Sequence, residues 1–173
     1  MTEVSPVSVL IRDHARMTTS LETVEEQIRS GEITKARQTL DAVEQAEGAS
    51  AEVFFLQGLA REREFDREGA VTLFLRALEQ DPGHQRAAFH AATICDQNGD
   101  EEAALDLYEQ CVQHPPIPVN ALINLAVLYE EDGRFDDAER LLTAVLDEHP
   151  NHFRATQFLK SVKSSYDMMY DEQ

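Results

Sequence analysis

Two histidines at metal-ligand spacing are the most chemically suggestive pair in the sequence, in the segment His149-Pro150-Asn151-His152. Two imidazoles three residues apart could bind a transition metal if a carboxylate or a thiol completed the site. Here Pro150 holds a turn, and no such third ligand is fixed beside the pair. We therefore interpret these histidines as part of a surface turn, and we predict no metal and no cofactor.

Patterns for other catalytic chemistry are also missing from the sequence. It contains no glycine-rich phosphate loop, no HExxH helix, no nucleophile elbow and no cysteine pair at metal spacing. The two cysteines, Cys95 and Cys111, occupy helical core positions, which favours buried free thiols over a disulfide. The sequence predicts that the protein is not an enzyme.

The charge balance excludes two classes of partner. The chain of 173 residues has 33 acidic and 15 basic side chains, which gives a formal net charge of −18. A surface this acidic repels phosphate backbones and anionic lipid heads, so we expect no direct nucleic-acid or membrane binding. No apolar run approaches the roughly 18–20 residues of a membrane helix, and the N-terminus lacks a secretory pattern. We therefore expect a cytoplasmic protein.

A 34-residue period organises the chain. Prolines at 82, 116 and 150 are 34 residues apart, and Gly48 takes the preceding place. Small residues recur in two columns, at Ala36, Ala70, Ala104 and Ala138 and at Gly58, Ala92 and Ala126. Large apolar residues recur at Leu40, Phe74, Tyr108 and Leu142, and turn residues at Gly31, Phe65, Gly99 and Gly133.

Within each period the apolar spacing is helical. Leu122, Leu125 and Tyr129 lie on one face of a helix that Gly133 ends, and a second helix from Ala138 follows. Each period is therefore an antiparallel helical hairpin, and its small residues allow the backbones to approach closely. One face of each hairpin stays bare until the next repeat covers it.

These columns resemble the tetratricopeptide repeat (TPR), a 34-residue helix-turn-helix unit. The resemblance implies an all-α, right-handed solenoid of four hairpins at residues 17–50, 51–84, 85–118 and 119–152. We expect an N-terminal extension at residues 1–16, with one long helix from about Ser8 to Ser30 that buries Leu10, Met17, Leu21, Val24 and Ile28. Residues 153–173 are expected to form a capping helix over 153–166 and a tail that begins a linker. Repeat two departs from the family pattern at Phe65, where glycine is usual.

The resemblance also implies that the first helix of each pair lines a concave groove for a peptide or a partner helix. The residues in the corresponding positions are Phe55, Leu59, Arg86, Phe89, His90, Asn120, Ile123, Asn124, Val127 and Arg154. Asparagine amides can bond a ligand backbone, and Arg86 and Arg154 can take up a carboxylate. The alternative is that Phe55, Leu56 and Phe158 pack against adjacent helices.

Two features narrow the choice of partner. The groove columns carry no lysine, which disfavours the chaperone-tail clamp found in some family members. All of the excess negative charge lies in the four repeats, at −4, −3, −5 and −6. We expect most of these carboxylates to be solvated or to lie near helix N-termini, with docking of a basic partner as the alternative.

The favoured hypothesis is a non-catalytic protein–protein interaction scaffold, and two others remain. Repeats three and four and the tail Asp-Met-Met-Tyr-Asp-Glu are similar to bacterial proteins in which TPRs precede a domain like the C-terminal domain of the RNA polymerase alpha subunit. The chain would then be the adaptor half of a transcription-associated protein. In the third hypothesis, the chain self-associates through the apolar stretch from Val7 to Ile11.

Overall fold

A computed structural model describes residues 20–170, and all of the regular structure in this range is helical. A helix at residues 20–29 comes first. The helices that follow are α2 (Ile33–Glu47), α3 (Ala51–Arg63), α4 (Arg67–Gln80), α5 (Gln85–Gln97), α6 (Glu101–Cys111), α7 (Val119–Glu131), α8 (Phe135–Glu148) and α9 (Phe153–Tyr170). The expected all-α class is confirmed for the described residues.

The helices begin at a constant interval. The first helices of successive pairs, α3, α5, α7 and α9, start at residues 51, 85, 119 and 153, and the second helices, α2, α4, α6 and α8, start at 33, 67, 101 and 135. Both series step by 34 residues, which is the period of the sequence columns. The terminal helix α9 therefore keeps the register of a first helix.

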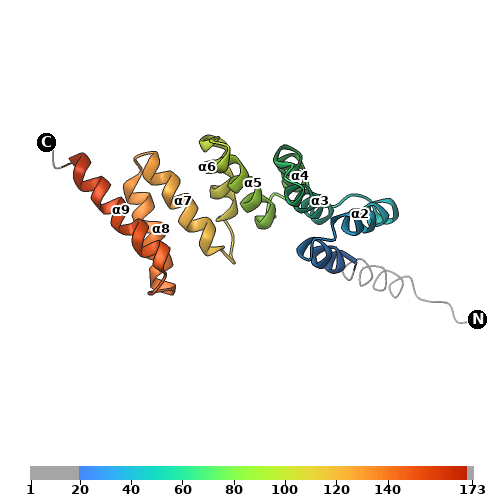
Figure 1. Cartoon of the computed structure of the whole chain (residues 1–173). Coiled ribbons are helices and arrows are strands. Elements are labelled where there is room, and N and C mark those ends of the chain that lie inside the picture. The colour runs from blue at the N-terminus through green and yellow to red at the C-terminus, as the bar shows by residue number, and fades with distance from the viewer. Residues whose placement is uncertain (1–19, 171–173) are drawn as a thin grey trace, which may run out of the picture. The chain divides into compact units, whose positions relative to one another are not determined.

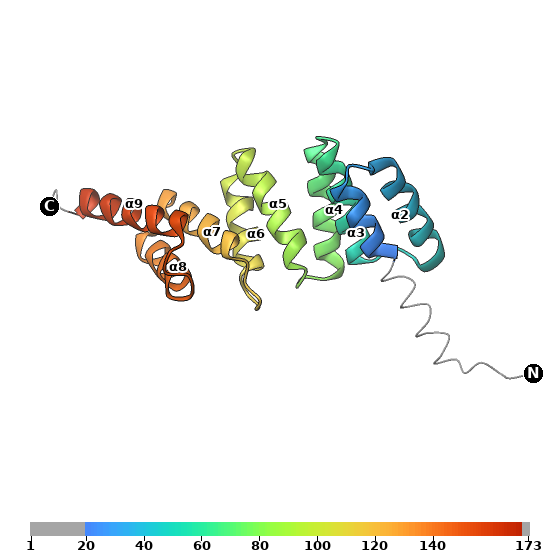
Figure 2. The same cartoon turned by 60° about the horizontal axis from the view of Figure 1, so that its bottom comes forward.

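The chain divides into two compact units between Ala87 and Ala88, and each is described by itself. In unit 1, α2 packs on α3 and α3 packs on α4, with the 20–29 helix beside them (Figures 1 and 2). The largest wholly buried side chains of this unit are Val24, Leu40, Val53, Phe55, Leu56 and Phe74. Leu21 and Ile28 are buried as expected, whereas Ser8, Leu10, Met17 and the Val7 to Ile11 stretch lie outside the described residues.

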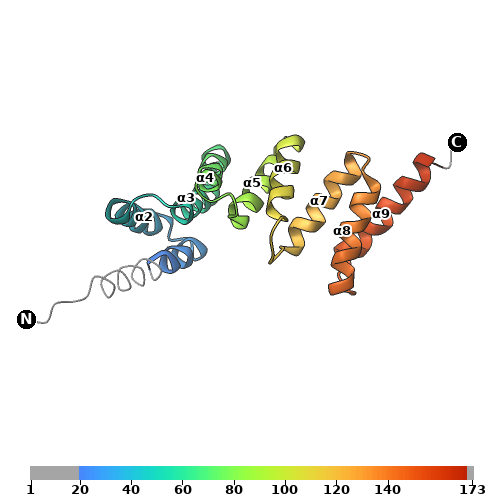
Figure 3. The same cartoon turned by 180° about the vertical axis from the view of Figure 1, so that it is seen from behind.

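Unit 2 contains α6, α7, α8 and α9 together with α5 from Ala88 onward. Here α6 packs on α7, α7 on α8, and α9 on both α7 and α8 (Figure 3). Its largest wholly buried side chains are Tyr108, Ile123, Leu125, Leu142, Val145 and Val162. Cys95 and Cys111 are confirmed as buried free thiols, and burial raises the pKa of Cys111 to about 11.

Helix α9 is longer than the sequence suggests. The capping helix, expected over 153–166, continues to Tyr170, so the tail expected to begin a linker is helical as far as this residue. Ser161 and Ser165 both donate hydrogen bonds to Glu130 of α7, and the Tyr166 ring lies 6.2 Å from Phe135 of α8. These contacts with two other helices stabilise a segment whose own helix propensity is weak.

The four turns within the hairpins share one conformation. The second residue after each first helix has a positive φ, 83° at Gly31, 62° at Phe65, 77° at Gly99 and 75° at Gly133. At Phe65 the backbone N–H bonds the carbonyl of Glu62 and the next N–H bonds that of Arg61, and the glycine turns repeat this pair of bonds. The hairpin of repeat two thus keeps the common turn, although its Phe65 side chain is 92% exposed and the left-handed backbone is strained.

Replacing Phe65 with glycine should stabilise the protein. Relief of the strained backbone, less the added entropy of the unfolded chain, should raise the free energy of unfolding by about 1 kcal/mol. Thermal denaturation followed by circular dichroism should show a midpoint about 2–4 °C higher. Phe65→Ala is the matched control, since it removes the exposed ring but keeps a β-carbon at positive φ, and it should give no comparable gain. Equal midpoints for the two variants would contradict the strain.

Small residues let the two helices of a hairpin approach closely. A β-carbon added at Gly58 of α3 would lie 2.5 Å from Cε1 of Phe74 in α4, well inside van der Waals contact. The Phe74 ring is wholly buried, and its centroid lies 5.7 Å from that of Phe55, so it has little room to move. Glycine at this column therefore determines how near α3 and α4 can lie.

Gly58→Ala should destabilise the protein by about 1–3 kcal/mol, because overpacking outweighs the helix propensity gained by alanine. Urea denaturation measures the loss. In a Phe74→Leu background the smaller side chain leaves room, so the same Gly58 change should be much less destabilising. Strictly additive effects in this double-mutant cycle would show that Gly58 and Phe74 do not limit each other.

Candidate functional site

The ten candidate groove residues fall in both units. Unit 1 contains Phe55, Leu59 and Arg86, and unit 2 contains the other seven, which are Phe89, His90, Asn120, Ile123, Asn124, Val127 and Arg154. Each set is therefore considered within its own unit.

In unit 1 the aromatic candidate is a core residue. Phe55 is wholly buried, with its ring centroid 5.7 Å from Phe74 and 4.9 Å from His84. Leu56 beside it is also wholly buried, and Leu59 is half-buried. Packing against adjacent helices, the alternative interpretation, accounts for Phe55 and Leu56.

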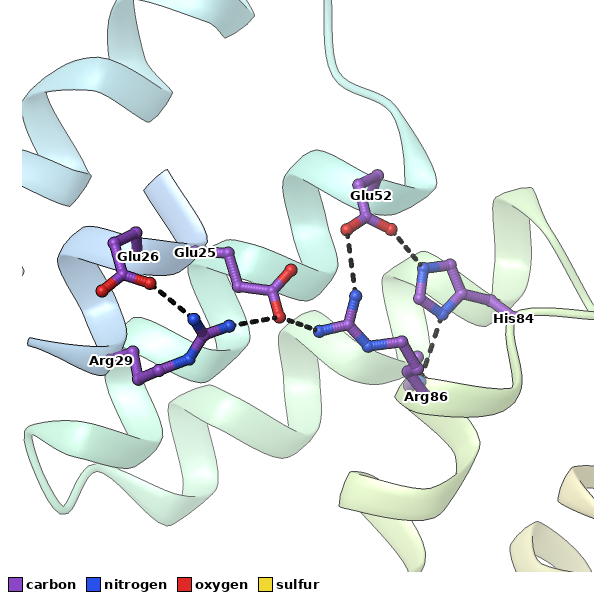
Figure 4. Close-up of polar contacts among 7 residues, drawn as sticks. Glu25, Glu26, Arg29, Glu52, His84 and Arg86 are labelled. Carbon is purple, nitrogen blue, oxygen red and sulfur yellow. Dashed lines mark hydrogen bonds and ion pairs between the residues drawn. The ribbon is translucent and has the colours of Figure 1, made fainter. Parts of the chain in front are cut away.

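Arg86 lies within a network of charged side chains (Figure 4). Its guanidinium is 2.8 Å from Glu25 of the 20–29 helix and 3.6 Å from Glu52 of α3. The same guanidinium lies 4.4 Å from the centroid of the Phe55 ring. Arg29 approaches Glu25 from the other side at 3.5 Å. Arg86 thus ties the first turn of α5 to two other helices, and its charge is neutralised within the unit.

His84 completes this network and directly precedes α5. Its Nδ1 accepts a hydrogen bond from the backbone N–H of Ala87 at 3.1 Å, so His84 caps the helix. Because neutral imidazole accepts through only one nitrogen, Nε2 carries the proton and donates to Glu52 at 3.0 Å. This hydrogen bond, with the charge of Arg86, holds the pKa of Glu52 below its usual range, although burial opposes the shift.

The lowered pKa of Glu52 predicts a loss of stability in acid. A carboxylate favoured in the folded state contributes stability above its unfolded pKa of about 4.3, and this contribution is lost as pH falls through the lower folded value. Thermal midpoints at pH 6 and pH 3 should therefore differ less for Glu52→Gln than for the unchanged chain. Glu79→Gln, which alters an exposed carboxylate, should keep the original difference. An identical pH dependence for all three proteins would contradict the prediction.

In unit 2 a chain of hydrogen bonds links four helices. Asn124 of α7 donates from Nδ2 to the Tyr108 hydroxyl of α6 at 2.9 Å, and this hydroxyl lies 3.1 Å from Oγ1 of Thr93 in α5. Arg154 of α9 donates to Oδ1 of Asn124 at 3.2 Å. Burial raises the pKa of the Tyr108 hydroxyl, and the hydrogen bonds from Thr93 and Asn124 partly offset that rise. The Asn124 amide is thus held from both ends.

The remaining candidates of unit 2 differ in exposure. Ile123 is wholly buried and belongs to the core, whereas Phe89, His90 and Val127 are half-buried and Asn120 is exposed. A pocket of about 400 Å³ opens beside them. It is lined by Phe89, Pro118, Val119, Asn120, His149 and His152. Helix α5, the start of α7 and the turn between α8 and α9 therefore line one pocket.

Two histidines have a structural role that sequence reasoning missed. His152 accepts a hydrogen bond from the N–H of Ala155 at Nδ1 and so caps α9, as His84 caps α5. Ser50 caps α3 from the same column of the repeat. The sequence contains a signal for this capping role, since positions 50, 84 and 152 share one column of the repeat. Each of them directly precedes a first helix. Among residues 20–170 no group of three or more metal-binding side chains occurs.

In unit 2 many acidic side chains lie on the second helices and in the turns before them. Asp100 caps α6, and Asp137 near the start of α8 pairs with Arg134 and Arg140. A second pocket of about 300 Å³ is lined by Glu101, Glu102, Leu105, Leu128, Glu131 and Asp132. Burial and the neighbouring carboxylates Glu101, Asp96 and Glu130 raise the pKa of Glu131. In the described range, no helix has the length and apolar composition needed to cross a bilayer.

Family models match most of the repeat region. One tetratricopeptide repeat model matches residues 55–116, and another matches residues 97–161. The chain belongs to the tetratricopeptide repeat family. The resemblance seen in the sequence is confirmed, and so is the fold class, a TPR α-solenoid. The exact repeat boundaries stay a prediction.

Two curated TPR relatives share moderate identity with this chain. Photosystem I assembly protein Ycf3 of Rippkaea orientalis (strain PCC 8801 / RF-1) is 32% identical over 99 residues, which are 51% of this chain and 57% of that protein. The human PEX5-related protein is 30% identical over 111 residues, 64% of this chain and 17% of that protein. The matched region thus spans from about a sixth to somewhat over half of these relatives.

Solved TPR structures share the fold. MamA from Desulfovibrio magneticus RS-1 gives a TM-score of 0.71 at 20% identity, covering 87% of this chain and 85% of that chain. A TPR protein from Parabacteroides merdae gives 0.71 at 20% identity, with 87% and 61% covered. Cut9 in the APC/C hetero-tetramer Cut9–Hcn1 gives 0.69 at 17% identity, with 84% and 29% covered. At these identities the likeness concerns the fold alone.

Proposed function

We propose that the chain is a non-catalytic interaction scaffold and that unit 2 binds an extended segment of a partner protein. The binding surface, here named the amide face, consists of Phe89 and His90 of α5, Asn120, Asn124 and Val127 of α7, and Arg154 of α9. The observation that carries the proposal is the hydrogen-bonded chain that holds Asn124 between Tyr108 and Arg154 beside an open pocket. A preorganised surface leaves most of the ordering cost to the ligand.

The side chains of the amide face suit a peptide backbone. Asn120 is exposed at the rim of the pocket, where its amide can both donate to a peptide carbonyl and accept from a peptide N–H. Phe89 supplies an aromatic wall to the same pocket, and such rings form the anchors of many interfaces. Phe55 and Ile123 are omitted because they are core residues, and Arg86 because it is already paired. Leu59 is omitted because it belongs to unit 1.

The relatives support a role in contact with other proteins. Ycf3, at 32% identity, is named as an assembly protein. The finer expectations stay predictions. These are the cytoplasmic location, self-association through Val7 to Ile11, and an RNA polymerase alpha C-terminal-like domain beyond Gln173.

Asn120→Ala combined with Phe89→Ala should abolish ligand capture without unfolding the protein. Twelve-residue peptides selected from a random displayed library against the intact chain serve as probes. Fluorescence polarisation should show at least about a tenfold loss of affinity for the double variant, with helical circular dichroism retained. We avoid Asn124→Ala here, because it would leave the buried Tyr108 hydroxyl without the amide.

Gln80→Ala, at the exposed end of α4 in unit 1, is the control and should bind like the unchanged chain. Peptides whose affinity is the same for the double variant and the control would place binding elsewhere and count against the amide face.

A further inference from the structure

We infer that the amide face selects a segment with an acidic side chain close to an apolar one, and that Arg154 binds the acidic group. This inference rests on the proposed function and specifies the chemistry of the partner. It is not obvious for a chain of net charge −18, which as a whole repels anions. The inference depends on which helices of unit 2 carry the acidic side chains.

In unit 2 most of the helical acidic side chains lie on the second helices, and few lie on the first helices. Residues 88–95, 119–129 and 153–166, which make up most of α5, α7 and α9, contain no aspartate or glutamate. The carboxylates of the second helices are Glu101, Glu102, Asp106 and Glu109 in α6 and Asp136, Asp137, Glu139, Asp147 and Glu148 in α8. The amide face therefore lies on stretches of α5, α7 and α9 that have no acidic side chains, whereas Asp96, Glu130, Glu131 and Asp167 lie toward the C-terminal ends of these helices. An incoming carboxylate near Asn120 and Arg154 meets no like charge within these stretches.

Arg154 is the cation of this region. It is exposed, and within residues 20–170 it forms no ion pair, in contrast to Arg86, which has two carboxylate partners. Its guanidinium donates to the neutral Oδ1 of Asn124 at 3.2 Å and lies 5.7 Å from the centroid of the Phe158 ring. One hydrogen bond leaves other N–H groups of the guanidinium available for a carboxylate. Asn124 thus positions Arg154 without neutralising it.

The pocket supplies the apolar part of the recognition. Phe89, Pro118 and Val119 line it, and its volume of about 400 Å³ is ample for a large aliphatic or aromatic side chain. The Asn120 side chain, one turn of α7 before Asn124, lies at its rim and can bond the intervening backbone. A ligand that fits both features carries its apolar and acidic groups a few residues apart.

Peptide selection, followed by neutralisation of single charges, tests the inference. Twelve-residue peptides selected from a random library against the intact chain should be enriched in aspartate or glutamate near an aromatic or large aliphatic residue. Replacing that acid with its amide in a synthetic peptide should weaken binding at least about tenfold, and added salt should weaken it further. In Arg154→Gln the same peptide substitution should have little effect, which identifies the contact by a double-mutant cycle.

Lys160→Gln is the matched control. It removes the same charge from the same helix, at an exposed side chain that has no ion pair in the described range and lies on another side of α9. It should retain both the affinity and the acid preference. Equal losses in Lys160→Gln and Arg154→Gln would reduce the effect to net charge and overturn the role of Arg154.

The remaining outcomes separate this inference from the proposed function. Neutral or basic peptides that depend on Phe89 and Asn120 would overturn the acidic preference and leave the scaffold function standing. Peptides insensitive to both residues would contradict the proposed function itself. The acidic helices α6 and α8 make a second copy of the chain the rival ligand. A dimer in sedimentation equilibrium that Arg154→Gln dissociates would replace the partner segment with that copy.

Discussion

The structure depends first on how closely the two helices of a hairpin can approach. In repeat two a residue without a side chain faces a large one, since Gly58 of α3 faces Phe74 of α4. This contact is recreated by the 34-residue period, because both helix series start at the same interval. Since each hairpin exposes an apolar face that its neighbour must cover, a constant interval places that face at the same positions of every repeat. The positions of the surface residues follow from that interval.

The four hairpin turns keep one backbone conformation even where the residue is unfavourable for it. Three of the four use glycine at positive φ, and Phe65 adopts the same conformation without the freedom of glycine. Pairing of α3 with α4 and the two turn hydrogen bonds evidently outweigh a local strain of about 1–2 kcal/mol. The repeat geometry therefore dominates over the preference of a single residue, as tertiary packing commonly does over propensity.

Polar groups close to the core link this scaffold to its surface. The Tyr108 side chain takes the place held by leucine or phenylalanine in other repeats, and its buried hydroxyl must find partners. It finds Thr93 and Asn124, and Asn124 in turn holds Arg154. In unit 1 the capping His84 donates a hydrogen bond to Glu52. Glu52 also pairs with Arg86, so this network ends in an ion pair. Arg86 and Arg154 occupy the same column of the repeat. They nevertheless differ in what they can still bind, because only Arg86 is already paired with carboxylates.

The sequence alone determined the period, the helical hairpins, the small and large columns, and the family, because these features follow from the spacing of residue types along the chain. It also placed Cys95 and Cys111 correctly in the core. Only the tertiary structure decided that Phe55 and Ile123 are core residues, that Arg86 is neutralised by Glu25 and Glu52, and that α9 continues to Tyr170. Each of these results depends on contacts between side chains that lie on different helices, such as the 61 residues that separate Glu25 from Arg86. A helical pattern tells which face of a helix is apolar, but the partner of a polar group on that face is set by the helices packed against it.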